Sequence, residues 1–231
     1  MTTGLNRVVA LVPMRHHSER VPGKNYRPLA GKPLYRHILD TLLAVPEIAE
    51  VVIDTDSPVI LDGLARDYPQ VRAIERPIHL RDGAIPMNEI LMHDTSLVPA
   101  DLYLQTHSTN PLLRAETLSH AIRTLRGVYP AYDSLFGVTR LQVRLWDQLT
   151  RPINHNPAIL LRTQDLPPVY MENSCVYLFT RQTLEQRRNR LGERPYMFEI
   201  PQDEAWDIDE ESTFQMVEFL LLGRQAKNQQ G

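Results

Sequence analysis

The sequence predicts an α/β protein with a doubly wound, mostly parallel sheet, and three observations lead to that prediction. Short apolar runs alternate with segments of helical periodicity over most of the 231 residues. Polar residues follow the apolar runs, as they do where parallel strands end at a ligand-binding edge. The composition, 42% hydrophobic and 23% charged, is that of a globular protein with a substantial core. We therefore expect one domain over residues 1–231, built as a Rossmann-like three-layer sandwich.

The first part of the chain supplies most of the predicted elements. The apolar run 8–14 predicts a buried parallel strand, and Leu34, Ile38 and Leu42 recur at helical spacing within 33–43. The strand at 51–53 stops at Asp54, and Ser57 before Pro58 predicts the start of a helix. Further strands are expected at 71–74, 102–104 and 134–138, and further helices opening at 88–93 and covering 115–125.

Residues 141–168 break this alternation, because proline and asparagine interrupt the stretch 151–157. We interpret this segment as an excursion from the domain, either a lid or an oligomerisation arm. The chain then returns with a strand at 175–179 and a helix at 182–190. A last amphipathic helix is expected at 211–222, followed by a frayed polar tail over 224–231.

Charge and cysteine content limit the classes of partner. The formal net charge of -3 gives no sign of a nucleic-acid partner, since duplex binders usually carry a basic face. Five basic residues instead lie within 15–32, which suits a small anion. Cys175 is the only cysteine, so an intrachain disulfide is impossible. The apolar runs are strand-sized, so we expect neither a signal peptide nor a membrane span, and the cytoplasm is the simplest location.

The loop 15–25 carries the first candidate chemistry. Directly after a strand, its arginines, lysine, serine and glycine can surround a triphosphate with cations and backbone N–H groups. It is neither a Walker loop nor a G-x-G-x-x-G dinucleotide turn. A solvated basic loop is the alternative that composition alone leaves open. The adjacent His16 and His17 are weak evidence for a metal, since a third ligand is not nearby in the sequence.

The stretch Leu11–Leu34 resembles the opening of the sugar-acid cytidylyltransferases, which make CMP-sialic acid and CMP-3-deoxy-manno-octulosonate. The pattern R-x-x-S-x-R-x-P-G-K, followed by G-K-P-L, carries the resemblance. It implies a nucleotidyltransferase fold in which Arg15, Ser18 and Lys24 contact the phosphates of CTP, with Asn25 assisting. Arg20 and Gly23 are more similar to the octulosonate enzymes than to the sialate enzymes.

A second candidate region is the turn 54–57 together with Arg76. Asp54 and Asp56 by themselves suggest a metal site, but we favour a strand end and a helix cap for Asp54 and Ser57. In the resembling family the corresponding T-D turn lines the nucleotide pocket, and the arginine of R-P lies near the cytidine. The resemblance therefore implies that Arg76 binds the nucleotide.

The string 162–174 resembles the sialate-type segment R-x-Q-D-L-P-P-x-Y-x-x-N-G, which holds the sugar acid. The match implies that Arg162, Gln164 and Asn173 bind sugar, the arginine through a carboxylate and the amides through hydroxyls. Ser174 replaces the usual glycine, so the backbone is expected to approach the ligand less closely. Gln105 follows the fourth strand, in a turn similar to the Q-x-T-S-P-L turn of the sialate enzymes, and is a further sugar-site candidate.

Asp207 and Asp209 form the candidate metal site. Aspartates two apart on an extended segment point to one face and can approach one hard cation, whereas an acidic helix N-terminus is the alternative from the residues alone. Resembling enzymes carry a similar W-x-D-I-D segment whose aspartates bind magnesium. The resemblance thus implies Mg²⁺ on Asp207 and Asp209.

Together these motifs predict transfer of CMP from CTP to an acidic 2-keto sugar, with Arg15, Lys24 and Asp209 as catalytic residues. Such products serve cell-surface polysaccharide synthesis. The family's arm implies a homodimer, in which Arg140, Arg144 or Arg162 completes the neighbour's site. We lean to a nine-carbon sialic acid-like acceptor. Octulosonate, another sugar or nucleotide on the same fold, and a non-catalytic nucleotide-binding relative remain alternatives.

Overall fold

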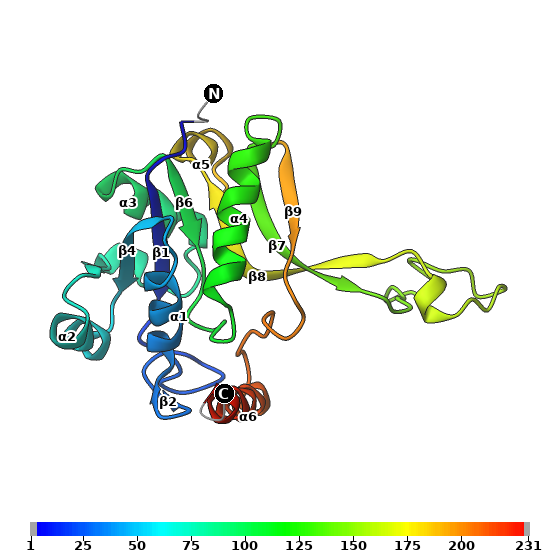
Figure 1. Ribbon diagram of the computed structural model, residues 1–231, viewed down its shortest axis with the longest axis horizontal. Helices are drawn as coiled ribbons and strands as arrows, with labels where there is room; N and C mark the ends of the chain where they lie inside the picture. Colours follow the sequence, from blue (N-terminus) through cyan, green and yellow to red (C-terminus); the bar gives the residue numbers. More distant parts are fainter. Residues whose placement is uncertain (1–3, 229–231) are drawn as a thin grey trace.

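The computed structural model describes residues 4–228, which form a seven-stranded sheet with helices on both faces (Figure 1). The strands lie in the order β5-β4-β1-β6-β8-β7-β9. Neighbours are parallel except that β8 runs antiparallel to β6 and to β7. The predicted α/β class with a mostly parallel sheet is confirmed. The strands of this sheet are β1 (Val8–Met14), β4 (Ile48–Thr55), β5 (Arg72–Glu75), β6 (Leu102–Gln105), β7 (Ser134–Leu141), β8 (Val169–Phe179) and β9 (Pro195–Glu199).

The central strand β1 is buried along its whole length and supplies both apolar layers. Val8, Ala10 and Val12 join a core cluster with side chains of α1 and α4, whereas Val9 and Leu11 join one with α3 and α5. Successive side chains of a strand point to opposite faces, so this division places helices on both sides of the sheet. The helices are α1 (Leu34–Leu43), α2 (Pro58–Asp67), α3 (Met87–Leu97), α4 (Ala115–Val128), α5 (Arg181–Arg187) and α6 (Glu211–Asn228).

Several boundaries test the sequence interpretation directly. Ser57 caps α2 as predicted, since its side chain accepts a hydrogen bond from the backbone N–H of Ile60 at 3.4 Å. The helix expected to reach residue 190 ends at Arg187, because Arg188 adopts a left-handed φ of 51° and turns the chain. Strand β9 was not predicted, since it is an edge strand with only Phe198 buried. The small hairpin of β2 (Pro28–Leu29) and β3 (Lys32–Pro33) was also not predicted, nor were the short turns η1 (Ile78–Leu80) and η2 (Thr163–Asp165).

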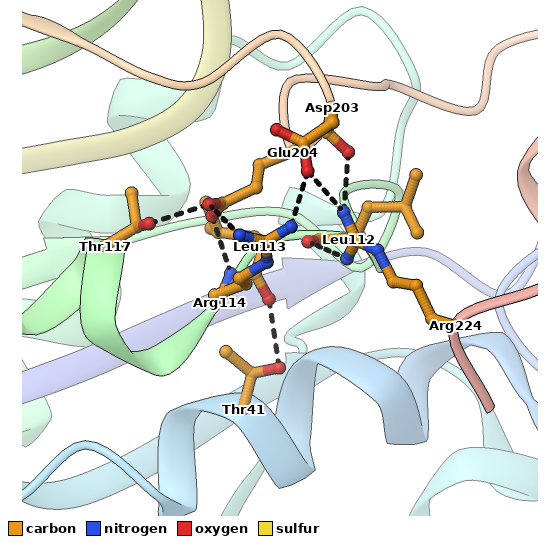
Figure 2. A network of polar contacts seen from close by, with 8 residues as sticks. All are labelled: Thr41, Leu112, Leu113, Arg114, Thr117, Asp203, Glu204 and Arg224. Carbon is orange, nitrogen blue, oxygen red and sulfur yellow. Dashed lines mark hydrogen bonds and ion pairs between the residues drawn. The ribbon is translucent and has the colours of Figure 1, made fainter. Parts of the chain in front are cut away.

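Helix α6 packs beneath the first loop and is longer than predicted. Phe214 and Val217 share an apolar cluster with Val21 of that loop and with Ile208. The helix continues through residues expected to be frayed, because Arg224 donates to the carbonyl of Leu112 at 2.7 Å and to that of Asp203 at 2.8 Å (Figure 2). Residues 229–231 of the predicted tail lie outside the described part.

The excursion predicted at 141–168 is an arm that projects from the body (Figure 1). The β7–β8 ladder continues to the pair Leu141–Val169 and forms the base of the arm. Within residues 4–228, none of the helices combines the length and the apolar character that a bilayer span requires. Large apolar side chains are exposed along the arm, namely Val143, Trp146, Leu149, Ile153, Ile159, Leu160 and Leu161.

Candidate active site

A cavity of about 620 Å³ opens at the sheet edge where β1 and β6 end. Its wall contains both the cationic loop that follows β1 and the acidic segment that precedes α6, although 182 or more residues separate them. The predicted site residues that line it are Arg15, Ser18, Lys24, Asn25, Arg76, Asp207 and Asp209. The fold therefore gathers the predicted phosphate-binding and metal-binding residues around one space.

The first loop is held in shape by its own polar side chains. Asn25 is buried, and its amide donates to the carbonyl of Arg15 at 2.6 Å while its oxygen accepts from Ser108 at 2.7 Å. Gly23 has a φ of +66°, a conformation that favours glycine, and a Cβ there would lie 2.9 Å from the ring of Tyr26. Asn25 therefore mainly links the first loop to the loop after β6, because its hydrogen-bonding atoms are already engaged.

Arg15 also lines the cavity, with its side chain against a second loop. Its guanidinium lies against Gly83, where an added Cβ would come within 2.6 Å of Nη1. Both residues line the cavity, and the side chain of Arg15 is exposed to it. Its charge can therefore meet an anion that enters from solvent.

Lys24 links the cationic loop to the acidic segment. Its ammonium donates to the carbonyl of Ile208 at 2.6 Å and lies 3.6 Å from Asp209, whose carboxylate also pairs with Arg20 at 3.0 Å. Burial lowers the pKa of Lys24, and the carboxylates of Asp209 and Asp207 partly oppose that shift. The cavity therefore has the amino group of Lys24 directly beside the carboxylate of Asp209.

Asp207 is the least satisfied polar group of the wall. Its Oδ1 is buried without a hydrogen-bond partner among residues 4–228, and burial raises the pKa of this carboxyl. An unpartnered carboxylate oxygen beside a second aspartate fits Mg²⁺, which protein sites often hold through one or two carboxylates together with substrate phosphates. The described residues contain no cluster of three or more metal-ligating side chains, so the other ligands would come from substrate and water.

The position of this acidic segment is set by buried contacts. Ile208 donates its backbone N–H to Thr109 at 2.9 Å, next to the loop after β6. One turn earlier, the buried carboxylate of Glu204 accepts from the backbone of Arg114 at 2.9 Å and from Thr117 at 3.0 Å (Figure 2). Glu204, which the sequence analysis did not single out, thereby fixes where the two aspartates stand.

Arg76 lines the cavity but is almost wholly buried and ion-paired with Asp54 at the end of β4. Asp54 is therefore a strand-end partner of Arg76, in agreement with the non-metal interpretation. Burial raises the pKa of Asp54, and burial together with Asp54 raises the pKa of Asp94 to about 8. Asp94 was missed because it stands within the helical pattern of α3, where a single acidic residue carries no signal.

Gln105 is fully buried at the end of β6 and does not itself line the cavity. Its Oε1 accepts from Arg190 at 2.5 Å, and its Nε2 lies 3.0 Å from the carbonyl of Thr106 and 3.1 Å from Nε2 of His107. Arg190 and His107 do line the cavity. Burial and the charges of Arg190 and Lys24 lower the pKa of His107 to about 4, so this ring is neutral near pH 7. Gln105 therefore affects the cavity only through its contacts with Arg190 and His107, which were not predicted as site residues from the sequence.

The remaining predicted sugar residues lie away from the cavity of their own chain. Arg162 and Gln164 are exposed on the arm, where Arg162 pairs with Asp165 at 2.7 Å. Asn173 is buried in β8 and donates to Thr139 at 3.1 Å, so its side chain fastens the β7–β8 ladder instead of facing the cavity. Ser174 does line the cavity, with a φ of 56°.

A sheet edge of this kind, with a cationic loop after its first strand beside two carboxylates, can take up a nucleotide and a divalent cation. The Cytidylyltransferase family model matches residues 9–226, and the chain belongs to that family. It is 25% identical to N-acylneuraminate cytidylyltransferase A of Danio rerio over 222 residues, which are 93% of this chain and 51% of that protein. It is 34% identical to CMP-N,N'-diacetyllegionaminic acid synthase of Legionella pneumophila over 121 residues, 50% of this chain and 52% of the relative.

A solved structure of CMP:2-keto-3-deoxy-manno-octonic acid synthetase complexed with CTP shares the fold. It superposes with a TM-score of 0.71 at 17% identity and covers 94% of this chain and 99% of that one. The chain spans about half the length of the first curated relatives it matches. Membership of the family is thus established by the sequence match, and the structural likeness adds the fold.

Proposed function

We propose that this chain transfers CMP from CTP to the anomeric oxygen of an acidic 2-keto sugar, releasing pyrophosphate. One observation carries the proposal: one cavity is lined by Lys24, Arg15 and an acidic segment whose Asp207 has a buried oxygen without a partner among residues 4–228. Relatives named for neuraminate and legionaminate support a nine-carbon acid as acceptor.

The reaction balances without a covalent enzyme intermediate. The anomeric oxygen forms a bond to the α-phosphorus, the bond to the bridging oxygen breaks, and the hydroxyl proton passes to water. Such chemistry depends on in-line positioning and charge neutralisation. His107 is a poor general base in this arrangement, because Gln105 already occupies its Nε2 and its pKa is low.

The chain's own residues divide the work between two walls. Lys24 and Arg15 stabilise the charge on the departing pyrophosphate, and Ser18 and Arg76 assist in holding the nucleotide. Asp207 and Asp209 would hold Mg²⁺, which when bound supplies positive charge to the α-phosphate and lowers the pKa of the attacking hydroxyl. Lys24 fixes the carbonyl of Ile208 between these aspartates, so it joins the two walls.

An arm with seven large exposed apolar side chains supports a homodimer, since a monomer rarely leaves so long an apolar surface in water. In such a dimer the arm would bring Arg162 and Gln164 to the partner's cavity. A reducing cytoplasm is the proposed location, because Cys175 is a free, buried thiol.

The test is pyrophosphate release from CTP and Mg²⁺ against a panel of N-acetylneuraminate, N,N'-diacetyllegionaminate, pseudaminate and 3-deoxy-manno-octulosonate. We expect turnover with one nine-carbon acid and its loss in Asp209→Asn, with Glu210→Gln, an exposed neighbour, as matched control. Turnover with octulosonate alone would move the acceptor to the eight-carbon class, which the match of Arg20 and Gly23 favours. Tight CTP binding without turnover would overturn the acceptor, and absence of CTP binding would overturn the function.

A further inference from the structure

Arg190 is a cation in the cavity wall that no motif of the sequence marks. The left-handed turn at Arg188 brings it back over the sheet, where its guanidinium donates to Gln105 at 2.5 Å. The guanidinium carbon also lies 3.4 Å from the centre of the Tyr177 ring. Contact with an aromatic face and a bond to a buried amide fix the plane of the guanidinium.

The charge of Arg190 is not neutralised by a carboxylate. Among residues 4–228 no acidic group lies within ion-pair distance of it, whereas Arg20 and Lys24 both reach Asp209. Glu172 is the acidic residue whose charge raises the pKa of Arg190, and its carboxylate accepts a hydrogen bond from the hydroxyl of Tyr177 instead. Burial lowers the pKa of Arg190, yet a guanidinium remains charged near pH 7. A half-buried cation without a counter-ion is stabilised when a ligand supplies the oxygen atoms.

The place of Arg190 in the sheet separates it from the triphosphate loop. Gln105 and Tyr177 belong to β6 and β8, on one side of β1, whereas Arg76 follows β5 on the other side. The cavity therefore runs across the sheet from Arg76, past the loop after β1, to Arg190. A nucleotide held by Arg76 and the first loop leaves the β6–β8 end for the acceptor.

The charge at this end of the cavity suits a singly charged carboxylate or a neutral carbonyl better than a second phosphate. His107 is neutral there, so its ring adds no positive charge beside Arg190. Beyond Gln105 and Tyr177, its guanidinium has no acceptor in the described chain. The free N–H groups of a planar guanidinium match two coplanar oxygen atoms or one carbonyl. Ser174, whose hydroxyl oxygen lies 3.3 Å from that of Tyr177, lines the same end.

We propose that Arg190 is the specificity-determining residue for the acceptor and binds a planar carboxylate or acyl carbonyl of the sugar acid. The inference rests on the proposed function for the identity of the acceptor, but the binding it describes can be measured without turnover. Gln105 then has a positioning role, because it orients Arg190 without reaching the cavity.

The experiment compares the wild type with Arg190→Met and Arg190→Lys, using Arg187→Met as matched control because Arg187 pairs with Glu193 at the surface. Acceptor binding is measured by calorimetry in the presence of CMP, and KM for acceptor and for CTP by pyrophosphate release. The probes are N-acetylneuraminate, its methyl ester and 3-deoxy-manno-octulosonate. We expect Arg190→Met to weaken acceptor binding about tenfold or more, with KM for CTP unchanged and Arg190→Lys intermediate.

The probes separate the two oxygen groups. If Arg190 binds the carboxylate, esterification and Arg190→Met will be non-additive, since each removes the same contact. If it binds the acyl carbonyl, the variant will weaken binding of the neuraminate and its ester but leave octulosonate unaffected. Equal acceptor affinity in wild type and Arg190→Met for every probe would overturn the inference.

Failure of the function and failure of the inference give different results. Acid binding that depends on Arg190 without any pyrophosphate release would sink the proposed reaction and keep the acceptor site. Turnover with an unchanged acceptor KM in Arg190→Met would keep the reaction and sink the role of Arg190. If the wild type neither binds nor uses any of the acids, both are wrong.

Discussion

The cavity wall and the arm differ in how their polar side chains are held. In the wall and directly behind it, Asn25, Glu204 and Gln105 are buried and each bonds groups that lie far away in sequence. In the arm, Arg162 is exposed and pairs only with Asp165, three residues further on. Tertiary contacts thus determine the geometry of the wall, whereas local contacts determine that of the arm.

This difference distinguishes the functions that a single chain can supply from those that need a second copy of the chain. A wall fixed by long-range contacts presents the same charges whether or not a second copy is present. The arm instead exposes apolar side chains such as Trp146 and Leu160, which gain stability only by burial against another surface. We therefore expect nucleotide chemistry to depend on the wall and acceptor recognition to depend on both.

The largest effect is expected at the wall, in Lys24→Met. The substitution removes the charge beside Asp209 and the bond to Ile208. Loss of one preorganised charge in such a site lowers kcat by about 10²- to 10³-fold, measured as pyrophosphate release at saturating CTP. Lys32→Met, which loses only a surface pair with Asp40, is the matched control. A kcat within a few-fold of the wild type would remove Lys24 from the chemistry.

The arm is tested by subunit complementation. Asp209→Asn damages the wall and Arg162→Ala damages the arm, so each homodimer is expected to have little activity. If arms cross between subunits, a mixed dimer holds one intact site, and equal exchange restores about a quarter of the wild-type activity. Activity is measured after co-refolding, alongside the molar mass by light scattering.

Two results would contradict the crossed arm. A monomer in solution would leave the exposed apolar side chains without the partner proposed for them. A dimer whose mixture shows only the mean of the two homodimer activities would place Arg162 outside the neighbour's site. Arg151→Ala, whose side chain pairs with Asp147 on the same arm, controls for loss of arm structure.

The same contrast between local and long-range contacts explains which features could be predicted from the sequence. Buried strands such as β1 are continuous apolar runs, and Ser57 before Pro58 is a local signal, so both were predicted correctly. The residues of the first loop and of 207–209 come together because each follows or precedes a core element. Arg190 and Glu204 could not be predicted, because their roles arise only when a turn or a loop brings them against another part of the sheet.

Asn173 shows what a resemblance in sequence cannot predict, namely the direction in which a side chain points. Its match to a sugar-binding segment identified a residue that this fold buries against Thr139 of β7, although the next residue, Ser174, lines the cavity. A resemblance carries residue identity, but the direction of a side chain at an irregular point of β7–β8 depends on the register, which shifts between Phe136 and Val138. Sequence patterns of period two cannot show such a shift.

A moderate effect is expected in Glu204→Gln, because Glu204 holds the segment with Asp207 and Asp209 in position. The carboxylate accepts from Arg114 and Thr117, and an amide keeps its shape but loses the charge and one acceptor oxygen. We expect the free energy of unfolding to fall by about 1–3 kcal/mol, measured by urea denaturation, and the Mg²⁺ concentration for half-maximal activity to rise. Asp203→Asn is the control, since its pairs are at the surface and such pairs contribute at most about 1 kcal/mol. Equal losses in both variants would mean that Glu204 does not fix the segment.

Asp94→Asn, behind the cavity wall, is expected to change the pH dependence of stability and to affect activity near neutral pH the least. Burial and Asp54 raise the pKa of Asp94 to about 8, so the folded state retains a proton that the unfolded chain releases near pH 4. Stability therefore falls as pH rises between these values, by up to about 1.4 kcal/mol per pH unit, and levels off above pH 8. Asparagine holds no such proton but can still donate to Asp54. The free energy of unfolding of Asp94→Asn, measured by urea denaturation, should therefore rise relative to that of the wild type from pH 5 to pH 9.

Two surface variants are the controls. The exposed Asp62→Asn should show the same pH dependence of stability as the wild type, and so should Asp165→Asn on the arm, because a surface pair with Arg162 stabilises little. Parallel curves for Asp94→Asn would show that the buried pair loses its proton well below pH 8 and that Arg76 alone balances both carboxylates.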